Sequence, residues 1–188
     1  MTKPRTILCL DLALANTGAA VISLEAAKDV LTYVETVHTE KNGKARTSDD
    51  EWRRTRELAD ALRRMVAEHD PAHVFVECPT GGSKSATAAR SMAVARGAAC
   101  AVLCGLGLPV TLVTAAQAKK AATGSSWASK EEVKRAVLSR FPDFNGWIRG
   151  KTGKVVAGLN EHAYDAVSVY MAATTTKQFK EIRNVAGK

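Results

Sequence analysis

The 188-residue sequence lacks several features that would assign it to a specialised class of protein. It has no uncharged apolar run of the ~18 residues that a membrane-spanning helix needs, so we expect no membrane association. It has only four cysteines, and none has a histidine nearby at zinc-ligand spacing, so we expect buried free thiols in a reducing compartment. The apolar N-terminal segment resembles a secretion signal, but Asp11 interrupts it, which favours a cytoplasmic protein.

Acidic residues are scarce in the second half of the sequence. From residue 78 onward there are 16 Lys and Arg against 6 Asp and Glu, and no acidic residue lies between Cys78 and Lys130. The first 77 residues instead carry a slight acidic excess. A field of one sign across half of a domain favours a polyanionic partner, and nucleic acid is the commonest one.

The order of the predicted strands and helices describes a single α/β domain over residues 1–188. Three β-rich stretches separated by turn residues predict an antiparallel meander, and two later strands follow helices. Because helical crossovers are right-handed, these later strands should run parallel to the first, which gives a mixed five-stranded sheet flanked by helices. The predicted strands cover residues 7–12, 19–24, 30–38, 73–77 and 109–113.

Helical periodicity predicts five helices around this sheet. The first is expected to bury an apolar face that includes Trp52. The second, over 85–106, is rich in alanine, and its small side chains allow close packing against the sheet and against a second copy of the chain. Residues 177–188 are expected to form a frayed basic tail. The expected N-cap of the first helix is Ser48 or Asp49, and those of the third, fourth and fifth helices are Thr114, Ser129 and Asn160.

Three carboxylates occupy positions where a structural role is hard to find. Asp11 interrupts an apolar strand and Glu77 ends another, and burying an unpaired carboxylate costs several kcal/mol. Acids at two strand ends indicate that these strands are neighbours and present both groups at one edge of the sheet. Asp165 follows His162 by three positions and Glu161 by four, so these side chains share one helical face.

Converging acids in a basic protein favour a hard divalent cation. Mg²⁺ takes oxygen ligands and leaves room for phosphate oxygens, and Mn²⁺ can substitute for it. Two ions ~3.5–4 Å apart would clamp the attacking and leaving oxygens of a phosphodiester displacement. His162 can bind an ion or handle the attacking water, and the choice between His162 and Glu161 as the assisting group stays open. The predicted metal ligands are Asp11, Glu77, His162 and Asp165.

The motifs around these residues resemble those of the RuvC-type Holliday-junction resolvases. Over residues 6–175 they follow in order as ILCLDLALANTGAAVI, VFVEC, ATAARSMAVARGAACAVL, AAQAKKAATG and HAYDAVSVYMA. The resemblance implies a ribonuclease-H-like fold and a homodimer. It also implies nicking of two opposed strands of four-way DNA with Mg²⁺ or Mn²⁺.

The resemblance also assigns roles to individual residues. It implies catalytic roles for Asp11, Glu77 and Asp165. Lys119 and Lys130 match two lysines that serve the scissile phosphate and the DNA backbone, and we expect Lys119 to neutralise charge that develops on the phosphate.

Some positions depart from the family pattern. His162 stands where members carry Asp or His, and Asp11 is followed by Leu12 and Ala13 where bacterial members have Pro and Gly. The segment 78–82 lacks the aromatic residue that wedges into the junction centre, and 144–159 is longer than usual. These differences suit a phage-type branch with broader activity on branched DNA, acting in the host cytoplasm.

Basic residues around the acids are candidates for DNA binding. In the loop 146–152 the glycines are one residue too close for a phosphate-binding loop, so no nucleotide cofactor is expected. Trp147 in this loop is instead expected to stack on an unpaired base. The candidate DNA-binding residues are Lys84, Arg90, Lys119, Lys120, Lys130, Trp147, Arg149, Lys151 and Lys154.

The leading hypothesis is a metal-dependent endonuclease that resolves branched DNA as a homodimer. A non-catalytic protein that binds branched DNA would share the basic half but needs no metal. A ribonuclease-H-like enzyme acting on RNA/DNA hybrids would share the acids. An actin-like ATPase would need glycine-rich phosphate loops after the first strand, which Asn16-Thr17-Gly18 supports only weakly.

Overall fold

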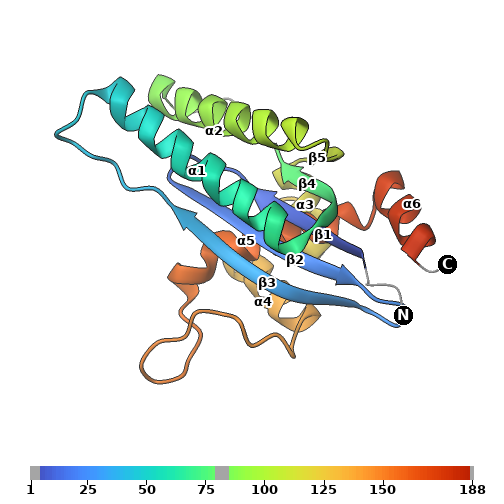
Figure 1. Ribbon diagram of the computed structural model, residues 1–188. Helices are drawn as coiled ribbons and strands as arrows, with labels where there is room; N and C mark the ends of the chain where they lie inside the picture. Colours follow the sequence, from blue (N-terminus) through green and yellow to red (C-terminus); the bar gives the residue numbers. More distant parts are fainter. Residues whose placement is uncertain (1–4, 79–84, 187–188) are drawn as a thin grey trace.

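A mixed five-stranded sheet forms the middle layer of the computed structural model, which describes residues 5–78 and 85–186 (Figure 1). The strands are β1 (Arg5–Asp11), β2 (Asn16–Leu24), β3 (Asp29–His38), β4 (Pro71–Glu77) and β5 (Val110–Val113). Their order across the sheet is β3-β2-β1-β4-β5. The first three strands form an antiparallel meander, and β4 and β5 run parallel to β1. The predicted mixed sheet is confirmed.

Helices cover both faces of the sheet (Figure 1). They are α1 (Thr47–His69), α2 (Ala86–Gly105), α3 (Ala115–Thr123), α4 (Lys130–Arg140), α5 (Ala157–Ala173) and α6 (Lys177–Ala186). Side chains alternate along a strand, so Leu8 and Leu10 of β1 pack with α1 and α2. Ile7 and Cys9 pack on the opposite face with α3, α4, α5 and α6. Both cores therefore meet at β1, the strand that carries Asp11.

Helix α5 lies unusually close to the sheet at Gly18 of β2. A Cβ atom built on Gly18 would lie 1.9 Å from the carbonyl oxygen of His162, which is backbone and cannot rotate away. Only glycine therefore allows this approach. The close contact determines how near the α5 residues lie to the end of β1. The sequence predicted Gly18 to be a turn residue and offered it as weak support for a phosphate loop, and this packing role was not predicted.

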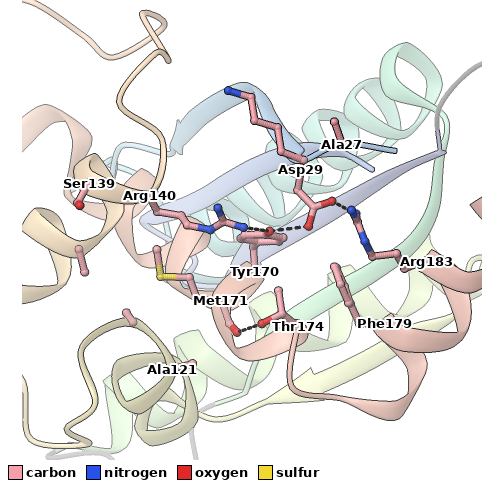
Figure 2. A pocket seen from close by; sticks show the side chains of 13 residues that line it. Ala27, Asp29, Ala121, Ser139, Arg140, Tyr170, Met171, Thr174, Phe179 and Arg183 are labelled. Atoms are coloured by element: carbon pink, nitrogen blue, oxygen red, sulfur yellow. Dashed lines mark hydrogen bonds and ion pairs between the residues drawn. The ribbon is translucent and has the colours of Figure 1, made fainter. Parts of the chain in front are cut away.

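Residues 177–186 form the helix α6, so the predicted frayed tail is wrong over this range. Phe179 is buried against the core, and Arg183 forms an ion pair with the buried carboxylate of Asp29 (Figure 2). The hydroxyl of Tyr170 donates to the same carboxylate at 2.7 Å. The apolar spacing of Phe179 and Ile182 was the overlooked signal, because basic residues dominate the segment.

The predicted caps of α3 and α4 are confirmed, and those of α1 and α5 are wrong. Thr114 and Ser129 each accept a backbone N–H and complete a full capping box at the starts of α3 and α4. Helix α1 begins at Thr47 after Arg46, which makes no side-chain cap, so neither Ser48 nor Asp49 takes this role.

Asn160 is not a helix cap, because α5 begins three residues earlier, at Ala157. Its buried amide instead joins the preceding loop to the helix. The side chain accepts from the backbone N–H of Ile148 at 2.9 Å and donates to the carbonyls of Ile148 and Val156 at 3.0 and 2.8 Å. The loop is thereby fixed at the start of α5.

Two further burial predictions are wrong. Trp52 is 77% exposed, because the buried stripe of α1 runs through Leu58, Leu62 and Met65 and, extended backwards, misses position 52. The thiols of Cys100 and Cys104 are exposed on α2, whereas Cys9 is buried as expected and Cys78 is half-buried. Within the described ranges, no helix has both the length and the apolar character to cross a membrane.

Candidate metal centre

Two acids of the candidate centre come from adjacent parallel strands. Asp11 ends β1, Glu77 ends β4, and the two residues are direct partners in the register of this pair. The predicted juxtaposition is confirmed, because the carboxyl ends of parallel strands lie at the same edge of the sheet.

Helix α5 adds two more groups to this edge. Ligand atoms of Asp11, His162 and Asp165 all lie within 4.8 Å of one another. The Nδ1 atom of His162 is 3.5 Å from Oδ2 of Asp11. The helical spacing of three residues brings His162 and Asp165 to the same side, and the close contact at Gly18 holds that side against β1.

Charge crowding in this cluster raises the pKa values of two carboxyl groups. Burial, with the charges of Asp11 and Asp165, raises the pKa of Glu77 to about 7. Burial and the charge of Asp11 raise the pKa of Asp165 to about 6. The hydrogen bond to Asp11 raises the pKa of His162. In the metal-free protein Glu77 is therefore partly protonated near neutral pH, because nearby positive groups do not compensate the charge of all three acids.

Two lysines border the acids. The positive charge of Lys119 on α3 acts to lower the pKa of Glu77, and Lys130 at the start of α4 forms an ion pair with Glu161. Glu161 is thus engaged by Lys130, whereas His162 faces Asp11. Of the two alternatives for the assisting group, the geometry favours His162.

The donor set fits a hard divalent cation. Asp11 and Asp165 supply carboxylate oxygens, and His162 supplies a ring nitrogen, within the 4.8 Å group. The predicted ligand Glu77 is outside that group, but it is close enough for the charges of Asp11 and Asp165 to raise the pKa of its carboxyl group. Within residues 5–78 and 85–186, no Lys or Arg forms an ion pair with these three acids, so salt bridging does not explain their burial. Oxygen-rich ligands of this kind suit Mg²⁺ or Mn²⁺.

The candidate DNA-binding residues differ in their exposure and in whether their charge is already paired. Lys120, Arg149, Lys151 and Lys154 are exposed, and Lys119 is half-buried beside the acids. Arg90 is exposed but forms an ion pair with Glu51 of α1, so its charge is already balanced. Lys84 lies outside the described residues.

Trp147 is not available for base stacking, and this prediction is wrong. The side chain is only 4% exposed. Its ring packs 4.8 Å from that of Tyr164 and edge-on to that of Phe144 at 5.0 Å between centroids. A tryptophan in a glycine-rich loop looked exposed, but the Asn160 amide folds this loop onto the core.

A cavity of about 790 Å³ lies away from the acids, between α3, α4, α5 and α6 (Figure 2). Asp29 on its wall begins β3 and pairs with Leu24, which in turn pairs with Arg5 at the start of β1. The acids lie at the other end of the same strand. The cavity is therefore separate from the metal centre, and its charged lining serves to join α6 to the sheet.

Replacing Glu77 by Gln is expected to stabilise the metal-free protein at pH 8. The Glu77 pKa is about 7 in the folded state against 4.5 ordinarily, so the folded state binds this proton more tightly and loses stability as pH rises from 4.5 to 7. Removing the charge should add on the order of 1–3 kcal/mol to the free energy of unfolding at pH 8, with little change at pH 4.5.

Urea unfolding in EDTA measures this effect. Glu131→Gln is the matched control, because Glu131 is an exposed acid on α4. A Glu77→Gln protein that is less stable than the wild type at pH 8 would show that Glu77 is held by compensating contacts instead of strained by its neighbours.

The strand order and the acids on β1, β4 and α5 together define a ribonuclease-H-like fold with a carboxylate–histidine site. The family model described as "Crossover junction endodeoxyribonuclease RuvC" matches residues 7–141, which include Asp11 and Glu77. The chain belongs to the RuvC family.

Curated relatives support this assignment over part of the chain. The crossover junction endodeoxyribonuclease RuvC of Trichlorobacter lovleyi is 40% identical over 84 residues, or 45% of this chain and 47% of that protein. The RuvC of Pelobacter propionicus is 38% identical over 86 residues, or 46% and 48% of the two chains. The aligned region thus spans about half the length of these relatives.

Solved structures share the fold over nearly the whole chain. T. thermophilus RuvC in complex with a Holliday junction substrate superposes with a TM-score of 0.66 and 22% identity, covering 90% of this chain and 93% of that one. The yeast mitochondrial Holliday junction resolvase superposes with a TM-score of 0.63 and 15% identity, covering 98% of this chain and 83% of that one. Both comparisons extend the shared fold beyond the residues that the family model matches.

Proposed function

We propose that this protein is a metal-dependent, structure-selective endonuclease that nicks four-way and other branched DNA. The observation that carries the proposal is the cluster of Asp11, His162 and Asp165 within 4.8 Å, beside Glu77. Membership of a family named for crossover junction cleavage supports the reaction, and the basic second half of the chain supports a nucleic-acid substrate.

In this function Asp11, Glu77, His162 and Asp165 would hold Mg²⁺, or Mn²⁺ in its place, with two ions per site. Bound ions would activate water and neutralise charge on the phosphate. The fold positions these groups. The register of β1 and β4 places the two strand-end acids side by side, and α5 places His162 and Asp165 next to Asp11. The hydrogen bond between the carboxylate of Asp11 and Nδ1 of His162 orients the imidazole ring.

The lysines provide the complementary part of the site. Lys119 lies where its charge acts on Glu77, and Lys130 is held by Glu161 at the edge of the acids. Both are placed to bind phosphates on either side of the bond that is cut, and Lys119 would neutralise charge developing on the scissile phosphate. Exposed Lys120, Arg149, Lys151 and Lys154 would extend this contact along the DNA backbone.

A homodimer fits this function, and we assign its contact to α2. The buried side of this helix consists of Ala95, Ala99, Val102 and Leu103. Its exposed side carries small residues that allow a second helix to approach closely, among them Ala89, Ala93, Gly97 and Ala101. Two copies would present two metal centres to a nearly twofold-symmetric junction. The protein would act in the cytoplasm.

The test is nicking of a synthetic four-way junction in Mg²⁺, in Mn²⁺ and in EDTA. A linear duplex and an RNA/DNA hybrid of the same sequence are the comparison substrates. We expect paired nicks in the junction with either metal, none in EDTA, and little cutting of the other two substrates. Preferred cutting of the hybrid would assign the ribonuclease-H alternative.

Calorimetry with Mn²⁺ separates the enzyme from a binding protein. We expect heat of binding from the wild type and its loss in Asp165→Asn. Tight binding of the junction with neither metal binding nor nicking would overturn the proposal in favour of a non-catalytic protein.

A further inference from the structure

Trp127 is held outside the core by an ordered loop between α3 and α4. Its side chain is 92% exposed, whereas the next residue, Ala128, is buried in the core. The backbone N–H of Trp127 donates to Oγ of Ser125 at 3.2 Å, and Ser129 caps α4. Because the loop is fixed on both sides of Trp127, the exposure of the indole is a property of the folded loop.

This loop connects the two helices that bring lysines to the metal centre. Lys119 lies on α3, where its charge acts on Glu77, and Lys130 begins α4, where it pairs with Glu161. Trp127 is three residues from Lys130, so their Cα atoms are at most about 11 Å apart. A DNA strand whose phosphate is held by Lys130 would therefore lie within a few nucleotides of the indole, since stacked nucleotides are about 3.4 Å apart along a strand.

The charges near Trp127 suit a nucleic acid better than a protein surface. No acidic residue occurs in the sequence between Cys78 and Lys130, so the segment leading to the loop is neutral or basic. The acids that follow are engaged: Glu131 forms an ion pair with Lys134, and Glu132 accepts hydrogen bonds from Ser129. An exposed indole offers a flat face, and the bases of single-stranded or opened DNA offer matching faces. Bases inside a duplex are already stacked on their neighbours and have no free face.

We propose that Trp127 is a binding site for an unpaired nucleobase beside the metal centre, with Lys119 and Lys130 holding the phosphates of the same strand. This inference rests on the proposed function and adds to it a means of selecting branched over linear DNA. The lysines would bind the phosphates of any DNA, whereas the indole would add affinity only for a strand with an unstacked base. The sequence assigned this role to Trp147, which the fold buries.

Binding in EDTA, where no strand is cut, tests the proposal. Trp127→Ala and Trp127→Phe are compared with Trp52→Ala, a matched control because Trp52 is also exposed, on α1. We expect Trp127→Ala to weaken binding of a four-way junction about 5- to 100-fold, with duplex binding within about twofold of wild type. Trp127→Phe should retain most of the affinity, and Trp52→Ala all of it.

Fluorescence provides a second measurement of the same contact. A junction with 2-aminopurine at the branch point should lose fluorescence on binding the wild type and Trp52→Ala, but not Trp127→Ala. Unchanged junction affinity in Trp127→Ala, or an equal loss on junction and duplex, would overturn the proposal. A dimer that dissociates on this substitution, measured by sedimentation, would assign Trp127 to a contact between copies and would also overturn it.

Failure of this inference differs from failure of the proposed function. If the wild type prefers and nicks the junction while Trp127→Ala behaves identically, only the base-binding site is wrong. If the wild type shows no preference for the junction over duplex, both the proposed function and this inference are wrong.

Discussion

Asp11→Asn is expected to reduce nicking of a four-way junction by on the order of 10³-fold or more. Asp11 contacts every part of the centre: it pairs with Glu77 in the sheet, and its carboxylate lies within reach of His162 and Asp165. Asn keeps the shape but removes one negative charge and one charged oxygen ligand. Metal affinity should therefore fall, whereas junction affinity in EDTA should stay the same or rise, because repulsion of phosphates decreases.

The measurements are single-turnover nicking in Mg²⁺ and junction binding in EDTA. Asp60→Asn is the control, because Asp60 is an exposed acid on α1 whose loss should leave both quantities unchanged. Nicking by Asp11→Asn at the wild-type rate would remove Asp11 from the reaction. Loss of folding is tested separately by the unfolding midpoint, which should not fall.

Gly18→Ala is expected to destabilise the protein by about 3 kcal/mol or more, since overpacking against backbone cannot be relieved by a rotamer change. The added Cβ would meet the carbonyl oxygen of His162 at 1.9 Å, so α5 must move away from β2. For a chain of this size such a loss lowers the melting temperature by roughly 6–12 °C. The displacement also moves His162 and Asp165 from Asp11, and a shift of about 1 Å can cost on the order of 10²-fold in rate.

Gly158→Ala is the matched control for this substitution. Gly158 lies in the first turn of α5 itself, and a Cβ built there meets nothing within 4 Å. Since alanine is the better helix former, this variant should be more stable by about 0.5–1 kcal/mol. A Gly18→Ala protein with wild-type stability and wild-type nicking would show that the helix is not positioned by this contact.

The sheet and the positions of the acids could be predicted because they depend on local pattern. Apolar strands alternating with capped helices fix the strand type, and Asp11 and Glu77 stand out as single charges at the ends of apolar strands. Parallel pairing then brings them together without further information. Capping boxes at Thr114 and Ser129 were equally local signals.

What could not be predicted depends on contacts between distant segments. Trp147 is buried because the Asn160 amide ties its loop to α5, and no local pattern distinguishes it from the exposed Trp127. Helix α6 is stabilised by Arg183 pairing with Asp29, 154 positions earlier. The close approach at Gly18 likewise requires knowing which helix crosses β2.

The distribution of the metal-binding groups along the chain has a consequence for biosynthesis. Asp11 emerges from the ribosome first and Asp165 long afterwards, on α5, which packs against strands that are synthesised before it. Shorter nascent chains hold isolated acids with little affinity for a divalent ion. A nascent chain therefore cannot assemble the candidate metal centre until residue 165 has been made and α5 has docked on the sheet.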